Sequence, residues 1–149
     1  GRLVLADAVS YARSLGLTRL VDVATLTGAV VVALGEDCTG VFGNDQDWID
    51  RITRAGARVG ERIWQLPTYP ESRERYKSDV ADLKNTGTRG GGAITGAMII
   101  GEFAEGAAWA HLDIAGTASS DRHTGHTPKG ATGGPVRTLV ALAESLASP

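Results

Sequence analysis

The sequence is short of the features that mark several classes of protein. Its single cysteine, Cys38, excludes an intrachain disulfide and suits a reducing compartment. No apolar run approaches the ~20 residues of a membrane-spanning helix. The net charge is only −2 and no basic stripe is present, so nucleic acid is not indicated as a partner. We therefore expect a cytoplasmic protein that does not enter a membrane.

Glycine, by contrast, is abundant: it accounts for 20 of the 149 residues, most of them scattered through turns. Such glycines indicate loops with backbone angles that other residues rarely adopt. A chain of this length suits one domain, and no internal repeat or linker divides it. It begins at Gly1 instead of a methionine, and its first residues already have a helical pattern. We therefore expect it to be a piece of a longer polypeptide.

Apolar residues recur at helical spacing in several segments, and glycine or proline marks some of their ends. The expected helices are residues 3–15, 48–59, 93–103 and 135–146. Asp45 or Asp47 can N-cap the second of these helices. Gly60 can end it, but Ile63, Trp64 and Leu66 continue the apolar pattern up to Pro67. A short helix or turn is expected at 29–34, and an exposed helical turn at 71–77.

Strand patterns alternate with these helices. The expected strands are residues 20–24, 39–42 and 109–114, with a short edge strand at 79–84. Residues 85–92 and 119–134 are glycine-rich or polar and are expected to be loops. Alternating strands and helices predict an α/β fold with a layered sheet.

The stretch 19–29 indicates where a site would lie. A nearly all-apolar strand runs into the hydroxyl-and-glycine turn 25–28, as a buried parallel strand does where it reaches the surface. In open α/β sheets, ligands gather at the carboxyl ends of such strands. A second turn of this kind follows the strand 109–114, at 115–118. These two turns are the first candidates for a binding site.

Arg2 has an unusual position, because it opens a helix where the macrodipole mildly disfavours a cation. A positive charge beside exposed backbone N–H groups makes an anion site. The simpler alternative is an exposed arginine with no ligand.

Other candidate residues each have a simpler explanation, which we favour. His111 and Asp113 point to the same face of a strand, as a metal or acid–base pair would. The alternative is a core histidine bonded to backbone and an aspartate that closes the strand. His123 and His126 have a ligand-like spacing, but a solvated loop fits them better. The thiol of Cys38 has no flanking motif and is expected to be buried and inert.

The glycine-rich loop 87–92 precedes an apolar helix and so resembles a phosphate-binding loop. It lacks the lysine and hydroxyl of the Walker pattern. A phosphate-binding module is therefore an alternative interpretation that we do not favour.

Four blocks of sequence, taken together, are more specific than any of these signals. They are Gly-Arg-Leu-Val-Leu-Ala-Asp-Ala (1–8), Asp-Val-Ala-Thr-Leu-Thr-Gly-Ala (22–29), Asn-Thr-Gly with Gly-Gly-Ala-Ile (85–94) and His-Leu-Asp-Ile-Ala-Gly (111–116). In order and spacing they resemble the cytosolic leucine aminopeptidase family. The resemblance runs from Gly1 to the final helix and is weakest at 119–132.

This resemblance implies a zinc-peptidase-like fold, with three layers and a mixed, mostly parallel sheet flanked by helices. It also implies a homohexamer whose subunits release N-terminal amino acids, leucine preferred, from peptides. Each subunit would use two divalent metal ions (Zn or Mn) and a bicarbonate ion. The family's metal-ligand signature ends in the Gly-Arg with which this chain starts, so the ligands would lie upstream and none is expected here. Residues 1–149 would be the C-terminal portion of one catalytic domain, without its upstream segment or the N-terminal domain.

The resemblance also assigns roles to particular positions. Arg2 matches the family's catalytic arginine, which holds the bicarbonate that acts as general base. Backbone N–H groups of Gly1 and Leu26 would bind the same anion. The substrate-binding positions would be Thr25, Leu26, Gly28, Ala115 and Ala118. Ala118 is smaller than the family pattern suggests, which leaves the side-chain preference open. The alternative from another class is a non-catalytic fragment or assembly module that has the fold but no metal site of its own.

Overall fold

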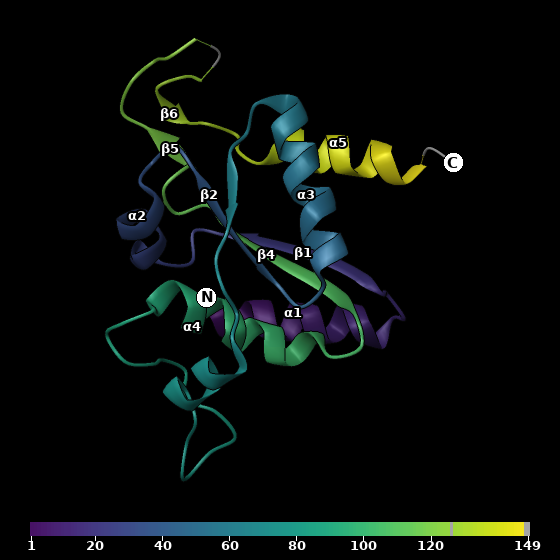
Figure 1. Ribbon diagram of the computed structural model, residues 1–149, viewed down its shortest axis with the longest axis vertical. Coiled ribbons are helices and arrows are strands. Elements are labelled where there is room, and N and C mark those ends of the chain that lie inside the picture. The colour runs from purple at the N-terminus through teal and green to yellow at the C-terminus, as the bar shows by residue number, and fades with distance from the viewer. Residues whose placement is uncertain (126, 148–149) are drawn as a thin grey trace.

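The computed structural model describes residues 1–125 and 127–147 and contains one four-stranded sheet (Figure 1). The strands lie in the order β1 (Arg19–Ala24), β4 (Ala108–Asp113), β2 (Thr39–Gly43) and β3 (Ile63–Gln65). The β1–β4 and β2–β3 pairs are parallel, and the β2–β4 pair is antiparallel. The sheet is therefore mixed and mostly parallel, as expected.

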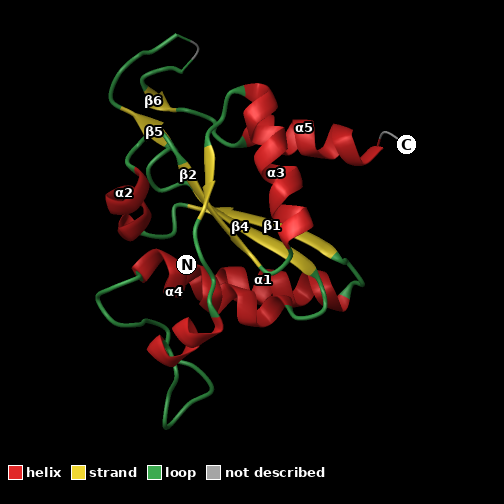
Figure 2. Ribbon diagram, in the orientation of Figure 1, coloured by secondary structure: helices red, strands yellow, loops and turns green. Residues whose placement is uncertain are grey.

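Helices cover both faces of this sheet (Figure 2). One face packs against α1 (Arg2–Ser14) and α4 (Gly92–Gly101), and the other against α3 (Gln46–Val59) and α5 (Val136–Ala147). Because side chains alternate along a strand, β4 serves both cores: Trp109 belongs to the first and Leu112 to the second. The three-layer α/β prediction is confirmed. No helix in the described part of the chain has the length and apolar character to cross a membrane.

The helix predictions are close to the structure, because glycine and aspartate define the ends as expected. Asp45, not Asp47, caps α3: its carboxylate accepts from the Trp48 N–H at 2.8 Å. Gly60 ends the helix in the left-handed conformation, with φ 75°. The remaining helical elements are α2 (Gly28–Leu34), η1 (Pro70–Arg75) and η2 (Glu102–Ala104), and η2 takes over the end of the helix predicted at 93–103.

The edge strand predicted at 79–84 is wrong, since these residues form bends and irregular backbone. The Ser78 hydroxyl accepts from the backbone N–H groups of Val80 and Ala81, at 3.3 and 3.1 Å. A serine that bonds its neighbours' backbone in this way competes with a sheet ladder. Two short strands inside the expected loop 119–134, β5 (Ser119–Ser120) and β6 (Gly130–Ala131), form a small antiparallel pair that was not anticipated.

A buried tyrosine ties η1 to the end of α4. The Tyr76 side chain is fully buried, and its hydroxyl donates to Glu102 Oε1 at 2.8 Å. Arg73 binds the same carboxylate with two N–H groups, at 2.9 and 3.0 Å. Burial, followed by the hydrogen bond and negative charge of Glu102, raises the pKa of Tyr76 well above its ordinary value.

We expect Tyr76→Phe to reduce stability by about 1 kcal/mol at neutral pH, the usual worth of one buried hydrogen bond. The tyrosine keeps its proton in the folded chain but loses it in the unfolded chain above about pH 10. Its stabilising effect is therefore present below pH ~10 and is lost as the pH rises further. Urea unfolding of both proteins at about pH 8 and about pH 11 should show the difference shrink. A difference that grew with pH would contradict this assignment.

Candidate active site

The carboxyl ends of β1 and β4 lie side by side. The two strands are parallel with Ala24 opposite Asp113, and the Ile114 N–H donates to the Ala24 carbonyl at 2.9 Å. The turns 25–28 and 115–118, singled out from the sequence, therefore leave the same edge of the sheet together. The structure thus joins two segments that lie almost ninety residues apart.

A cavity of about 290 Å³ opens beside the first of these turns. Its lining residues come from the start of α1, the turn before α2, the loop 86–88 and the start of α4; they are Arg2, Leu26, Thr27, Gly28, Ala29, Thr86, Gly87, Thr88, Gly92 and Thr95. Figure 1 shows the N-terminus beside the start of α4. Three of the positions assigned from the sequence, Arg2, Leu26 and Gly28, therefore meet at one cavity.

Arg2 supplies the positive charge of this cavity. Its Nη1 donates to the Asn85 carbonyl at 2.9 Å, which links the start of α1 to the glycine-rich loop. A guanidinium carries five N–H donors, so this bond leaves others for a ligand. The arrangement provides a cation and neighbouring backbone N–H groups, which is suitable for an anion.

The remaining assigned positions are not among the residues that line this cavity. Gly1 is the exposed N-cap of α1, and Thr25 is exposed at the end of β1. Ala115 and Ala118 are half-buried in the turn after β4. The Ala118 N–H donates to the Ile114 carbonyl at 2.9 Å, which fixes this turn.

Asp113 lies at the end of β4 and closes this strand, as the simpler alternative for the His111–Asp113 pair predicted. Its carboxylate is 1% exposed and accepts hydrogen bonds from Leu26, Thr27 and Ala115. The Leu26 N–H, which the family resemblance gives to an anion, is thus engaged by Asp113 at 3.1 Å. The sequence predicts an aspartate that ends the strand, but it contains no signal that this aspartate joins both turns.

His111 is buried, but among the described residues its side chain contacts a carboxylate and no backbone group, so this part of the expectation is wrong. Its Nδ1 lies 2.5 Å from the carboxylate of Asp22, its partner in the β1–β4 register. Asp22 also accepts from the Trp109 indole N–H at 2.7 Å. Among the described residues the His111 Nε2 has no hydrogen-bond partner. His111 and Asp113 therefore contact different partners and do not act as one pair.

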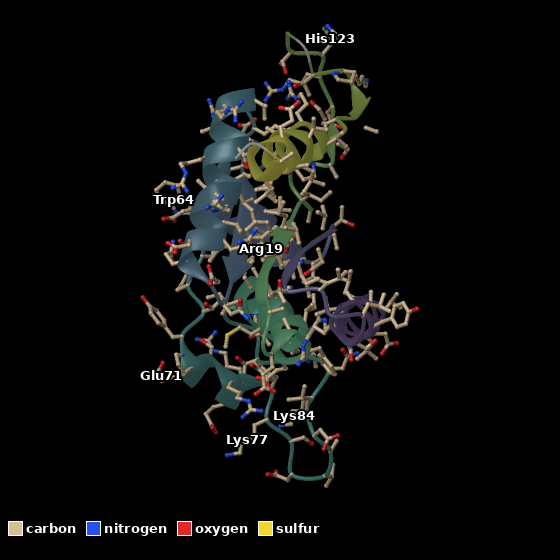
Figure 3. The ribbon with its side chains drawn as sticks, turned by 90° about the vertical axis from the view of Figure 1, so that its right-hand side faces the viewer. Arg19, Trp64, Glu71, Lys77, Lys84 and His123 are labelled. Carbon is tan, nitrogen blue, oxygen red and sulfur yellow. The ribbon has the colours of Figure 1, made fainter. Side chains whose placement is uncertain are left out.

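The glycine-rich loop 87–92 contributes to the lining of the cavity, whereas His123 and Cys38 do not. Figure 3 shows His123 at the end of the molecule opposite Lys77 and Lys84, where its side chain is exposed. His126 lies outside the described residues. Burial raises the pKa of the half-buried Cys38 thiol, and the opposing effect of Arg62 is smaller. A raised pKa leaves little thiolate at neutral pH, which supports the prediction of an inert thiol. The prediction that this thiol is buried holds only in part.

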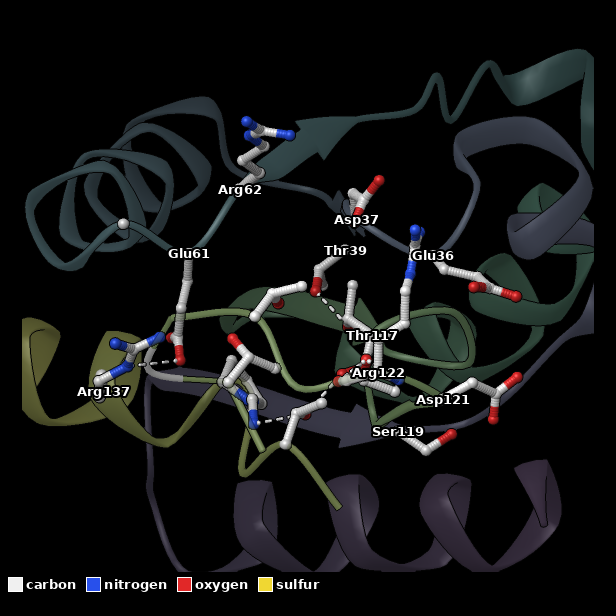
Figure 4. Close-up of a pocket in the computed structure, with 17 residues that line it drawn as sticks. Glu36, Asp37, Thr39, Glu61, Arg62, Thr117, Ser119, Asp121, Arg122 and Arg137 are labelled. Atoms are coloured by element: carbon white, nitrogen blue, oxygen red, sulfur yellow. Dashed lines mark hydrogen bonds and ion pairs between the residues drawn. The ribbon is translucent and has the colours of Figure 1, made fainter. Parts of the chain in front are cut away.

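A second cavity, of about 190 Å³, lies between the end of α3, the β5–β6 pair and the start of α5 (Figure 4). Side chains of both signs line it, and Arg137 pairs with Glu61 at 3.2 Å. Figure 4 shows Arg62 and Arg122 apart from each other, on separate loop segments. Mixed charges of this kind select no particular ligand.

A metal site was not expected in this chain. Across residues 1–125 and 127–147, no three His, Cys, Asp or Glu side chains are grouped so as to hold a metal ion. The residues present therefore do not fit a metal centre by themselves.

Comparison with known proteins gives a consistent relationship. The model of the cytosol aminopeptidase family, catalytic domain, matches residues 1–140. "Probable cytosol aminopeptidase" of Alkaliphilus metalliredigens is 55% identical over 98% of this chain and 29% of its own length. The protein of the same name from Bacillus subtilis is 52% identical over 97% of the chain and 29% of its own. This chain thus spans less than a third of these relatives.

A solved structure has the same fold. A mutant of tomato leucine aminopeptidase superposes with a TM-score of 0.88 and 44% identity, over 95% of this chain and 27% of that one. The family match over nearly the whole length, together with this fold, shows that the chain belongs to the cytosol aminopeptidase family.

Proposed function

We propose that this chain is the C-terminal part of the catalytic domain of a metal-dependent aminopeptidase. The whole protein would release N-terminal amino acids from peptides, with leucine preferred. The observation that carries the proposal is the cavity where Arg2, Leu26 and Gly28 meet, in a chain that belongs to an aminopeptidase family. The names of the relatives, cytosol aminopeptidase and leucine aminopeptidase, support the same reaction and a cytoplasmic location.

Arg2 is proposed to hold a bicarbonate ion, with the Gly1 N–H as a second donor. The bound bicarbonate would supply a general base, and the fixed charge of Arg2 keeps it in place without reorganisation. The Leu26 carbonyl and the Gly28 N–H would align the substrate peptide along the turn 25–28. Thr25, Ala115 and Ala118 would contact the substrate from the two turns. The Leu26 N–H would reach the anion only by sharing its bond to Asp113.

Two divalent metal ions, Zn or Mn, are proposed to bind to the rest of the same polypeptide and to lower the pKa of the attacking water. This proposal follows from the family relationship. The described residues do not fit a metal centre, so no step of the reaction through a metal is derived from them.

The rest of the polypeptide is also proposed to cover the outer face of α1. Four large apolar side chains of that helix and its C-cap are exposed: Leu3, Val4, Tyr11 and Leu15. Isolated apolar side chains at a surface are ordinary, but a row along one helix indicates a buried contact in the complete protein. A homohexamer, as the family resemblance implies, is the proposed assembly.

The test is an assay of the full-length protein for release of leucine from a chromogenic leucine amide, with manganese or zinc present. We expect turnover in the range of typical enzymes, roughly 1–10³ s⁻¹, and none from residues 1–149 alone. Activity of the full-length protein distinguishes the proposal from the alternative of a metal-free assembly module, and metal analysis of the isolated chain tests where the metal ligands lie. An inactive full-length protein would contradict the proposed function, and tight stoichiometric metal on the isolated chain would contradict the upstream position of the ligands.

A further inference from the structure

Asp113 is the one described side chain that binds backbone groups of both candidate turns. Its Oδ1 lies 3.1 Å from the Leu26 nitrogen, 3.4 Å from the Thr27 nitrogen and 3.2 Å from the Ala115 nitrogen. Its Oδ2 accepts from the Thr27 hydroxyl at 2.7 Å. A buried carboxylate needs this many donors, because burial without them costs several kcal/mol.

The hydrogen bonds of the Thr27 hydroxyl explain why position 113 needs an aspartate. The same oxygen accepts from the Val30 N–H at 3.1 Å and so caps α2. Since a hydroxyl has one hydrogen, that hydrogen points to Asp113 Oδ2. An asparagine would keep one oxygen for the backbone N–H groups but would present an NH₂ group to the hydroxyl. It could not satisfy Thr27 and the turn together.

We propose that Asp113 is a positioning residue for the peptide substrate. By holding the N–H groups of Leu26 and Thr27, it sets the direction of the Leu26 carbonyl and the Gly28 N–H, which would align the peptide. By holding the Ala115 N–H, it fixes the second turn relative to the first. Asp113 itself is buried and does not contact the substrate. This inference rests on the proposed function, since it deepens the role of the same turn.

The neighbouring Asp22 provides a control that distinguishes a positioning role of Asp113 from a purely stabilising one. Asp22 also joins β1 to β4, but it binds the side chains of Trp109 and His111 in the core. The Asp22 pair with His111 lies two residues before the Ala24 pair with Asp113 in the same register. Both aspartates thus stabilise the same pair of strands, whereas Asp113 alone holds the turns.

The test compares Asp113→Asn with Asp22→Asn in the full-length protein, assayed with a leucine amide. For Asp113→Asn we expect KM to rise about tenfold and kcat to fall about threefold, because misplaced backbone groups weaken alignment of the peptide. For Asp22→Asn we expect a lower thermal midpoint with KM unchanged. Loss of folded protein lowers the apparent kcat but leaves KM unchanged, so the KM shift reports positioning. Thr27→Val removes the hydroxyl that Asp113 accepts from, together with the cap of α2. It should raise KM about threefold and is the substitute variant if Asp113→Asn does not fold.

Hydrogen exchange of the full-length proteins gives a readout that does not need activity. Asp113→Asn should speed exchange in peptides covering residues 25–30 and 113–118, and Asp22→Asn should not. An inactive wild type would refute the proposed function, and exchange would still decide whether Asp113 holds the turns. Unchanged exchange, an unchanged KM in Asp113→Asn, or an equal rise of KM in Asp22→Asn would each overturn the positioning role.

Discussion

Replacing Arg2 by alanine in the full-length protein is expected to lower kcat for leucine release by about 10²-fold, the usual loss when one preorganised electrostatic group is removed. Arg2 opens α1 and lines the cavity together with Leu26 and Gly28. The positive charge of Arg2 would stabilise the negatively charged bicarbonate next to the substrate. The proposed role is to hold bicarbonate, so added bicarbonate should raise the rate of the variant more than that of the wild type. Steady-state kinetics over a bicarbonate series measures both effects.

Arg13→Ala is a matched control for this experiment. Arg13 lies at the other end of the same helix, and its Nη1 donates to the Phe103 carbonyl at 3.1 Å. Arg2 makes an equivalent bond to the Asn85 carbonyl, so each substitution removes one such bond. Arg13→Ala should cost about 1 kcal/mol of stability and leave kcat unchanged. Equal activity of Arg2→Ala and wild type would remove Arg2 from the mechanism.

Much of the fold is predictable from the sequence, because local signals and tertiary packing agree. The strand 20–24 was recognised by its apolar run and the helix after Asp45 by its cap, and both are present. The short strand β3 was not among the predicted strands, because three residues are too few to show a periodicity. At 79–84, by contrast, a strand was predicted that is not present. The Ser78 hydroxyl bonds the neighbouring backbone N–H groups, which outweighs a weak strand pattern.

Only part of the candidate site is predictable from the sequence. Its two turns followed from the strand ends, and their meeting follows from the parallel pairing of β1 with β4. The role of Arg2 came from the family resemblance, since an arginine at the start of a helix has no distinctive pattern of its own. The contacts of Asp113 were not predictable, because hydrogen bonds over 86 and 87 residues depend on register and turn geometry together. The motif His-Leu-Asp-Ile-Ala-Gly was the available signal for them.

Gly116→Ala is expected to cause the largest loss of stability among these substitutions, about 3 kcal/mol, as overpacking at a site without room does. Gly116 is buried in the turn after β4. An added Cβ would overlap with the Gly35 carbonyl oxygen and would lie 3.4 Å from the Glu36 Cα. These are backbone atoms, so no flexible side chain can move aside. Gly35 is itself fixed as the C-cap of α2, with φ 72°.

The control for this effect is Gly90→Ala. Gly90 has no atom within 4 Å of an added Cβ and lies in an exposed loop, so we expect its stability to change by less than about 0.5 kcal/mol. Thermal and urea midpoints of the two full-length variants provide the comparison. Because the turn 115–118 would move away from α2 to relieve the overlap, Gly116→Ala should also raise KM for leucine amides. A stable Gly116→Ala with unchanged KM would mean that the turn and the end of α2 move independently, and the close contact would then have no part in shaping the site.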